Sequence, residues 1–301
     1  MSATTSSFFS LLPCLALPGL TLGRSLATIV PGLAVKNDCV FGNYVPDEIK
    51  AQSAAIARSG RPMVYSLSPG VSDVAKAREI APFVNMYRLT GDVWDNFKLP
   101  AALADLEFIT QSGLSGAAGL NGSSWPDMDM LPFGYICSQN AAHCPDHLSR
   151  MAPNTQQALL ATWAIAGAPL FFDGDCRKMD AATLALLTMT EVLEVNSAAK
   201  NRTQLYALLD GGIRTGGAFA AQSTRNAGTR YVLLLHPKGD DYPPPLPQMS
   251  VDWARDFALP RGAVCAVRDL FNGTELGRFQ DNFTANVLDS FLLVSVHTCS
   301  Q

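Results

Sequence analysis

Short apolar runs that end in polar residues alternate with helical stretches from Leu33 to about Leu193. In chain order the runs read "GLAVKND", "RPMVYSLS", "FVNMYRLTGD", "GLNGSSWPDMDM" and "APLFFDGD". A segment between two runs such as Pro46–Gly60, with proline near its start and glycine at its end, is typical of a helix. This alternation predicts a layer of parallel strands, in a doubly wound sheet or a barrel, with the site at the carboxyl ends of the strands.

The pattern changes after the last of these helical stretches, "MDAATLALLTMTEVLEVN", which we interpret as one helix. From about Asn201 onward the runs "TRYVLLLHPKG", "GAVCAVRDLFNGTELGRF" and "SFLLVSVHTC" are typical of strands, separated by Asn-Gly, Asp-Asn and proline-rich turns. No helix of any length is expected there. The sequence therefore predicts an atypical segment at 1–32, a parallel α/β region at 33–200 and an all-β antiparallel domain at 201–301.

The composition is that of a globular protein. The 301 residues are 48% hydrophobic and 16% charged, with a net charge of -4, and this balance argues against a nucleic-acid partner. The longest apolar stretch, Phe8–Leu20, is too short to span a membrane. It is similar to the core of a secretory signal but lacks a basic region before it, so an alternative N-terminus remains open.

Cysteines and glycosylation sequons favour a secreted, lysosomal or vacuolar protein. Seven cysteines are present; loss of Cys14 with a signal peptide would leave an even number, and Cys137 and Cys144 are spaced to form a disulfide-closed loop. Four Asn-x-Ser/Thr sequons fit an extracytoplasmic route. Their asparagines are Asn121, Asn201, Asn272 and Asn282.

Acidic residues dominate the ends of the predicted strands. No histidine lies at a strand end and no G-x-S-x-G motif occurs, which argues against a histidine-rich metal hydrolase and a serine triad. Cys137, His143, Cys144 and His147 could be considered as zinc ligands, but their spacing fits no standard site, so we expect no metal. The strand-end acids are Asp38, Asp92, Asp127, Asp129, Asp173 and Asp175.

Paired carboxylates without histidine are what glycoside hydrolysis needs, one as a nucleophile and one as an acid. Lys36 would keep Asp38 charged, and Arg88 lies four residues before Asp92. Nearby aromatic residues suit stacking on sugar rings, although for Tyr87 and for Trp163 a place in the core is favoured. These neighbours are Tyr65, Tyr87, Trp94 and Trp125.

Five ordered motifs carry a resemblance to glycoside hydrolase family 27, closest to its plant-type branch of α-galactosidases and β-L-arabinopyranosidases. They are "VKNDCVFG", "RPMVYSLSPG", "VNMYRLTGDVWDNF", "SWPDMDMLPFG" and "WAIAGAPLFFDGDCRKMD". The match covers roughly Leu33 to Asn196, and "VRDLFNGTELG" resembles the family's C-terminal β-sandwich. The resemblance implies a (β/α)8 TIM barrel, a β-sandwich domain and a retaining double displacement that uses no cofactor.

The same resemblance implies the catalytic roles. The K-x-D motif puts the nucleophile at Asp38 and a sugar-binding lysine at Lys36. The R-x-x-x-D motif puts the acid/base at Asp92 and a substrate contact at Arg88. We expect the two carboxyl groups to lie near the ~5–5.5 Å of retaining enzymes.

Further motifs imply the walls of the sugar subsite. The W-x-D-x-D-M motif makes Asp129 and Met130 wall residues, with Trp125 close by. Ser68 stands where the family discriminates at the sugar's 2-position. The implied ligand is a small or oligosaccharide substrate with a terminal galactose or arabinopyranose, and a homodimer is possible.

The chain also departs from the family pattern. Family members carry three more βα units before the nucleophile strand, whereas residues 1–32 resemble none of them, so we expect only the C-terminal five units of the barrel. The family's partner for Cys39 lies in that upstream part. The leading hypothesis is a retaining exo-glycosidase; the alternatives are a truncated, inactive remnant or sugar-binding pseudoenzyme, and a doubly wound α/β binding module.

Overall fold

The computed structural model describes residues 34–38, 45–68, 74–116, 120, 122–136, 147–237, 248–287 and 290–300, with the side chains of Asp38 and Val74 outside that description. The chain divides into two compact units. Unit 1 draws on residues 1–94, 117–149 and 169–184, and unit 2 on residues 95–116, 150–168 and 185–301. The domain boundaries at residues 32 and 200 stay a prediction.

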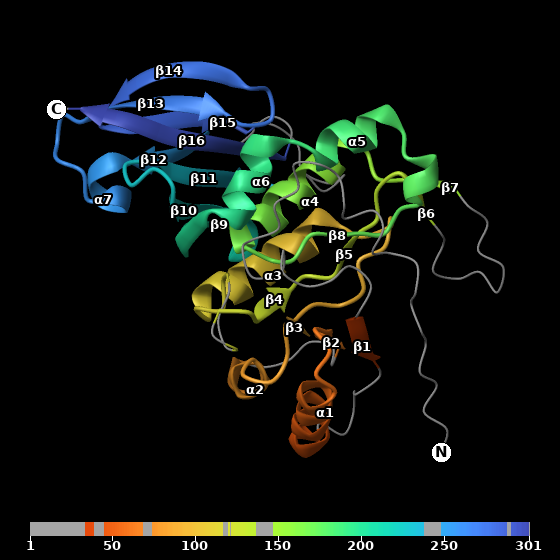
Figure 1. Ribbon diagram of the computed structural model, residues 1–301. Coiled ribbons are helices and arrows are strands. Elements are labelled where there is room, and N and C mark those ends of the chain that lie inside the picture. The colour runs from red at the N-terminus through yellow and green to blue at the C-terminus, as the bar shows by residue number, and fades with distance from the viewer. Residues whose placement is uncertain are drawn as a thin grey trace. The chain divides into compact units, whose positions relative to one another are not determined.

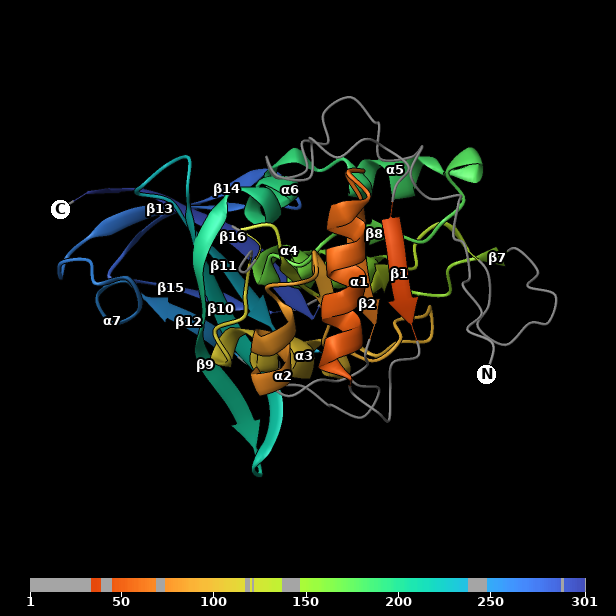
Figure 2. The same cartoon turned by 60° about the horizontal axis from the view of Figure 1, so that its bottom comes forward.

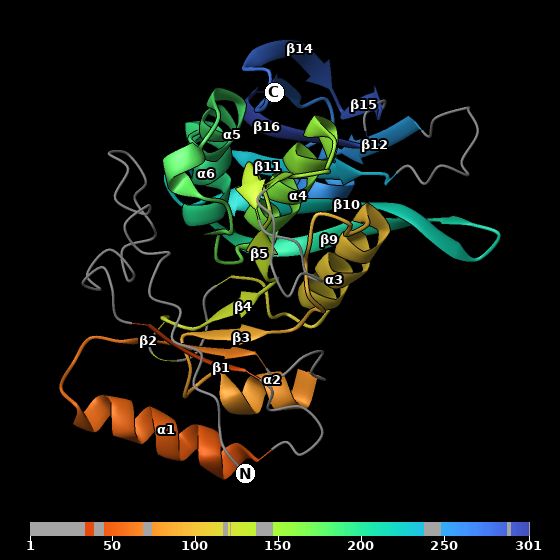
Figure 3. The same ribbon diagram turned by 90° about the vertical axis from the view of Figure 1, so that its right-hand side faces the viewer.

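Unit 1 is built on a four-stranded parallel sheet whose strands follow chain order, β1-β2-β3-β4. Helices α1 and α2 lie on one side of this sheet (Figure 3). Strands in chain order with connecting helices on one face are the arrangement of a barrel segment, whereas a doubly wound sheet carries helices on both faces. The elements are β1 (Ala34–Asp38), α1 (Pro46–Arg58), β2 (Val64–Ser68), α2 (Val74–Ile80), β3 (Met86–Arg88) and β4 (Trp125–Asp127).

Helix α1 begins and ends where the sequence indicates. Pro46 stands in the first turn, where a missing N–H costs nothing, and Asp47 and Glu48 complement the positive end of the helix dipole. The helix ends at Arg58, and Gly60 then adopts a positive φ of 66°. Local signals alone therefore place this crossover.

Two short strand pairs complete the described part of unit 1. Strands β5 (Met130–Leu131) and β8 (Phe171–Phe172) pair in parallel, and β6 (Tyr135–Ile136) pairs antiparallel with β7 (His147–Leu148). The 3-10 turn η2 (Cys176–Lys178) follows β8, and Cys176 is disulfide-bonded.

Unit 2 packs helices against an antiparallel sheet of six strands in the order β14-β13-β16-β11-β10-β9 (Figure 1). Helix α4 is buried at every position from Ala158 to Ala166, because α3, α6 and strands β10 and β11 surround it. The β9–β10 hairpin extends past the neighbouring strands (Figure 2). The elements are α3 (Leu99–Gln111), α4 (Pro153–Ala166), α6 (Thr190–Ser197), β9 (Ala199–Asp210), β10 (Ile213–Ser223), β11 (Arg230–Leu235), β13 (Val264–Asp269), β14 (Thr274–Gln280) and β16 (Phe291–Ser300).

A second sheet of two strands, β12 (Gln248–Asp252) and β15 (Asn282–Asn286), covers the core of this domain. Met249, Val251 and Phe283 from the small sheet share one hydrophobic cluster with residues of the large sheet, which is the packing of a sandwich. The disulfide Cys265–Cys299 joins β13 and β16, a pairing that the cysteine spacing did not indicate.

Two predictions about helices are wrong. The segment interpreted as one helix is two, α5 (Ala181–Leu187) and α6, because Met189 between them has extended backbone (ψ 97°). The flanking Thr188 turns its hydroxyl to the carbonyl of Ala185, and such local competition weakens helices. The all-β part also contains one short helix, α7 (Trp253–Phe257), which is capped by Asp252.

Among the described residues, no helix combines the length and the apolar character that a membrane crossing demands.

Candidate active site

The carboxyl ends of the four parallel strands lie at one level. Asp38, the last residue of β1, is the register partner of Ser68, the last residue of β2. Leu67 pairs with Tyr87 of β3, so Ser68 and Arg88 are the next residues of their strands. Arg88 in turn pairs with Asp127, the last residue of β4. The strand pairing therefore aligns three residues that the sequence singled out, Asp38, Ser68 and Arg88, along one edge.

Alternation along the strands separates the site face from the core face. Tyr65, Leu67 and Tyr87 point to the other face from Arg88 and are only 2%, 0% and 0% exposed. Tyr65 and Tyr87 are therefore core residues rather than platforms for a sugar, as the burial reading of Tyr87 predicted. Trp125, paired with Met86, lies on the face of Arg88 and is half-buried.

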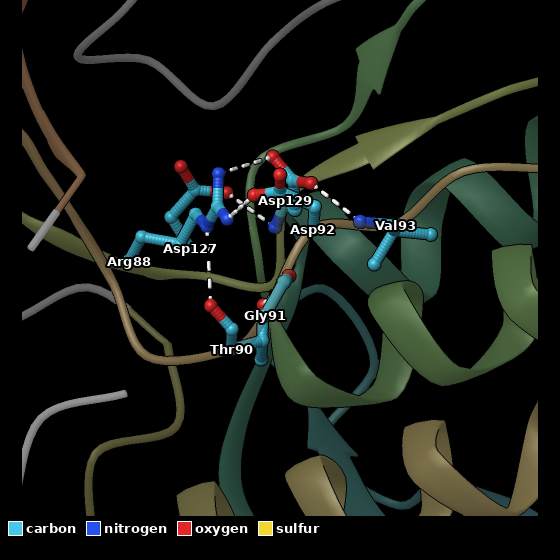
Figure 4. Close-up of polar contacts among 7 residues, drawn as sticks. All are labelled: Arg88, Thr90, Gly91, Asp92, Val93, Asp127 and Asp129. Atoms are coloured by element: carbon cyan, nitrogen blue, oxygen red, sulfur yellow. Dashed lines mark hydrogen bonds and ion pairs between the residues drawn. The ribbon is translucent and has the colours of Figure 1, made fainter. Parts of the chain in front are cut away.

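Arg88 is the centre of the polar contacts in this region (Figure 4). Its side chain is buried, and its Nε donates to the carbonyl of Thr90 at 3.1 Å. One terminal nitrogen donates to Oδ1 of Asp129 at 3.1 Å, and the other donates to Asp92. A single guanidinium thus joins the predicted acid/base to a predicted wall of the sugar subsite.

Asp129 is held through both its carboxylate and its backbone N–H. Its Oδ2 accepts from the backbone N–H of Val93 at 2.7 Å, and its own N–H donates to Oδ1 of Asp127 at 2.8 Å. Asp129 has a φ of +76°, which is unfavourable for a side-chain-bearing residue and persists only where surrounding contacts enforce it. Backbone strain of this kind is concentrated at functional sites.

The electrostatics of this cluster are set by burial. The pKa of Asp127 is raised to about 6, chiefly by burial and also by the Asp129 charge, while the hydrogen bond from the Asp129 N–H and the charges of Arg88 and Lys36 oppose the rise. Burial also raises the pKa of Asp129. Burial works to lower the pKa of Arg88, but the carboxylates of Asp129, Asp92 and Asp127 outweigh it and leave that pKa raised.

Asp173, which directly follows β8, joins the same cluster although the site prediction omitted it. Its pKa is raised to about 6, chiefly by burial and also by the Asp129 charge, while the Lys36 charge opposes the rise. Lys36 therefore interacts electrostatically with three carboxylates, those of Asp127, Asp129 and Asp173. The available sequence signal was the position of Asp173 at a strand end.

For the remaining predicted site residues, the structure gives burial or backbone position rather than side-chain contacts. Ser68 is 1% exposed, and its hydroxyl has no hydrogen-bond partner within the described part of the chain. Met130 is half-buried at the start of β5. The side chain of Asp38 is outside the described residues, so its separation from Asp92 stays a prediction. Also outside them lie Cys14, Cys39, Asn121, Cys137, His143 and Cys144.

Chemically, the arrangement offers two cations and several carboxylates on one sheet edge. Charged donors and acceptors in such a pattern can bind the hydroxyl groups of a neutral polyol through charge-assisted hydrogen bonds.

Residues 35–198, more than half of the chain, match the family model described as alpha galactosidase A. The chain is 30% identical to human alpha-galactosidase A over 154 residues, which are 50% of this chain and 32% of the human protein. It is 28% identical to the alpha-galactosidase of Coffea arabica over 238 residues, which are 78% of this chain and 54% of that protein. The chain thus spans about a third to a half of the length of these two relatives.

Solved structures agree with this similarity. A GH27 β-L-arabinopyranosidase from Geobacillus stearothermophilus, determined in complex with arabinose, has a TM-score of 0.74 at 26% identity. The match covers 89% of this chain and 59% of the arabinopyranosidase chain. Alpha-galactosidase I from Mortierella vinacea shares the fold, with a TM-score of 0.64 at 21% identity, covering 88% of this chain and 68% of its own. The predicted fold, a parallel α/β region of the TIM-barrel type followed by an antiparallel β domain, is confirmed.

Proposed function

Because the chain belongs to the alpha-galactosidase A (Melibiase_2) family, we propose that it is a retaining exo-glycosidase that releases terminal α-D-galactosyl or β-L-arabinopyranosyl residues from oligosaccharides or glycoconjugates. One observation supports this most strongly. The register of β1 to β4 aligns Asp38, Ser68, Arg88 and Asp127 on one edge, where Arg88 also binds Asp92 and Asp129.

The proposed reaction has two displacements. In the first, a carboxylate oxygen of Asp38 bonds to the anomeric carbon while the glycosidic C–O bond breaks and Asp92 gives its proton to the departing oxygen. In the second, Asp92 takes a proton from water, the water oxygen bonds to the anomeric carbon, and the bond to Asp38 breaks. Two inversions at one carbon restore the original configuration.

The sugar subsite in this proposal is formed by side chains of the same edge. Arg88 and Asp129 are fixed by their mutual hydrogen bond, so they present a preorganised donor and acceptor to sugar hydroxyls. Ser68 is small and buried, and the family resemblance places it where the sugar's 2-position is read, so it leaves the choice of substituent there open. The other proposed contacts are Lys36, Trp125 and Met130.

The proposal names both galactose and L-arabinopyranose as the released sugar because the two differ only at C6. The Geobacillus structure was determined with arabinose, and several relatives are named alpha-galactosidases. A purely sugar-binding, non-catalytic protein is the rival proposal.

The cellular location of the protein is also part of the proposal. Disulfides at Cys265–Cys299 and at Cys176 are typical of oxidising compartments, which supports a secreted or lysosomal location. The sequons are consistent with a glycoprotein.

The test is turnover of an aryl α-D-galactoside and an aryl β-L-arabinopyranoside by the purified chain, beside Asp38→Ala and Asp92→Ala. The half-buried Asp175, which binds the exposed Arg177, supplies the control Asp175→Asn. The proposal expects turnover in the wild type and the control and a loss of at least about 10³-fold in both site variants. Turnover that survives Asp38→Ala, or a soluble, cooperatively folding wild type that binds sugar without turnover, would contradict it.

A further inference from the structure

The proposed acid/base, Asp92, depends on its surroundings to hold it in place. Its side chain is 55% exposed, and it follows the exposed Gly91 in residues 89–93, the acid loop, which leads away from β3. A general acid must stay within hydrogen-bond distance of the departing oxygen, and a mobile carboxyl group meets that condition only part of the time. The contacts of the acid loop therefore bear directly on the first displacement.

Backbone N–H groups anchor both ends of the acid loop to the chain at the end of β4. The N–H of Leu89 donates to the carbonyl of Asp127 at 3.1 Å, and the N–H of Val93 donates to Oδ2 of Asp129 at 2.7 Å. Leu89 and Val93 are also buried, whereas Asp92 is exposed. The Asp129 carboxylate thus fixes the residue that directly follows Asp92.

Asp129 also holds the acid loop through Arg88 (Figure 4). One terminal nitrogen of the buried Arg88 donates to Oδ1 of Asp129 at 3.1 Å, and the other donates to the carboxylate of Asp92. The Nε of Arg88 donates to the carbonyl of Thr90 at 3.1 Å, which ties the guanidinium to the loop itself. Asp129 therefore acts on Asp92 by two routes, one through the backbone and one through the guanidinium.

The position of Asp129 is itself enforced. Its φ is +76°, its side chain is only 10% exposed, and its N–H donates to Oδ1 of the buried Asp127 at 2.8 Å. An unfavourable backbone conformation persists only where the surrounding structure imposes it. Asp129, with each carboxylate oxygen bound to a protein donor, is thus a rigid support for the acid loop.

We propose that Asp129 is a positioning residue: by holding both the Val93 N–H and the Arg88 guanidinium, it keeps the acid/base in place to protonate the departing oxygen. This rests on the proposed function for the role of Asp92. It goes beyond that function because it assigns Asp129 a part in the proton-transfer step, and not only in the wall of the sugar subsite.

The variant that tests this is Asp129→Asn. It turns one of the two accepting oxygens into an NH2 group that only donates, so one of the contacts to Arg88 and Val93 is lost. Asparagine is among the residues that best tolerate a left-handed backbone, so the chain should keep its path. The matched control is Asp175→Asn, because Asp175 likewise accepts from an arginine side chain and a backbone N–H, both of Arg177.

The kinetic readout is kcat/KM, which reports on the first displacement, for two glycosides that differ only in the leaving group. A dinitrophenyl group leaves without protonation, whereas a phenyl glycoside needs the acid. We expect Asp129→Asn to lower kcat/KM about 10- to 100-fold for the phenyl glycoside and by no more than about threefold for the dinitrophenyl glycoside. Asp92→Ala should show the same pattern more strongly, and Asp175→Asn should lower neither rate.

A sugar contact or a merely structural role predicts a different pattern. Either would lower kcat/KM of Asp129→Asn by the same factor for both glycosides, and that result overturns the inference. So does a variant that loses nothing with either glycoside. Melting temperatures are measured alongside, because partial unfolding removes active protein for both substrates equally and cannot create a dependence on the leaving group.

A second measurement does not depend on turnover. NMR follows hydrogen exchange at the Val93 N–H, which donates to the Asp129 carboxylate. We expect exchange to accelerate about 5- to 10-fold in Asp129→Asn, because a charge-assisted hydrogen bond is lost, and to stay unchanged in Asp175→Asn. Unchanged exchange in Asp129→Asn refutes the anchoring of the loop. If the wild type hydrolyses neither glycoside, the proposed function fails, and Val93 exchange alone decides whether Asp129 holds the acid loop.

Discussion

Arg88 connects the polar groups of this site. Its buried guanidinium supplies three donors to three different acceptors, Thr90, Asp92 and Asp129. Arginine suits this place because its guanidinium group stays charged and its planar set of N–H donors holds several oxygens at fixed angles. The nearly buried Asp129 depends on it, since an unpaired carboxylate in that place would be costly.

Replacing Arg88 by methionine should therefore destabilise the protein. We expect the free energy of unfolding, measured by urea denaturation at pH 7, to fall by about 3 kcal/mol, because the variant leaves a buried charge without its partner. The matched control is Arg177→Met, because Arg177 is 88% exposed and loss of its solvent-screened ion pair with Asp175 should destabilise the protein far less than loss of Arg88. Equal losses in the two variants would contradict this account of Arg88.

At the scale of elements, helix ends depend on what packs against them. Helix α4 is capped by Gly167, whose φ is +69°, and helix α1 is followed by Gly60, whose φ is +66°. The surroundings differ. A Cβ at Gly167 would lie 2.7 Å from the guanidinium of Arg202, whereas nothing lies within 4 Å of one at Gly60. Arg202 cannot easily move, because it donates to the carbonyls of Val195, Asn196 and Ala199.

The two glycines therefore give a matched test. Gly60→Ala and Gly167→Ala both force alanine into a left-handed conformation, at a cost of about 1–2 kcal/mol. Gly167→Ala should lose roughly a further 1–3 kcal/mol to the clash with Arg202. Urea unfolding of both variants measures the difference, and a cost no larger for Gly167→Ala would show that Arg202 yields freely.

Elements could be predicted from sequence where the signal was local. The five apolar runs became β1, β2, β3, β4 and β8, and proline and glycine located α1. What local patterns missed depended on partners distant in sequence. Cys265 meets Cys299 only because β13 lies beside β16.

At the scale of the whole molecule, several carboxyl groups are poised to titrate together. Burial raises the pKa of Asp127, of Asp173 and of Asp105 in α3, each to about 6, whereas an unfolded aspartate titrates near ~3.9. Between these two values the folded state binds more protons than the unfolded state. The free energy of unfolding should therefore decrease as pH rises from about 4 through about 6.

This gives a prediction about pH. Urea unfolding should show greater stability at pH 5 than at pH 7, and in Asp127→Asn that difference should shrink by about 1 kcal/mol, because only the part of the pKa shift between pH 5 and about 6 falls within this window, at about 1.4 kcal/mol per pKa unit. The amide can still accept from the N–H of Asp129, so the hydrogen bond survives. Asp175→Asn is the control, because Arg177 lowers the Asp175 pKa to about 2, below this range. Equal stability at pH 5 and 7 in the wild type would contradict the prediction.

That Arg88, Asp92 and Asp129 lie together could be predicted from sequence, because the ends of neighbouring parallel strands meet at one edge of the sheet. That logic located Arg88, Asp92 and Asp129, and their contacts bear out their proximity. It did not show which of the strand-end acids belong to the site, and the site prediction therefore left out Asp173. Its environment depends on the β5–β8 pairing and on Lys36, which only the folded chain reveals.

In the proposed reaction, Asp38 forms a covalent bond with the sugar. The most direct measurement is mass spectrometry of the chain after brief exposure to a 2-fluorinated galactosyl or arabinopyranosyl fluoride, which slows release of the intermediate. We expect one added glycosyl group on the peptide that contains Asp38, and none in Asp38→Ala. A glycosyl group on another residue, or no adduct on a chain that turns over the aryl glycosides, would contradict it.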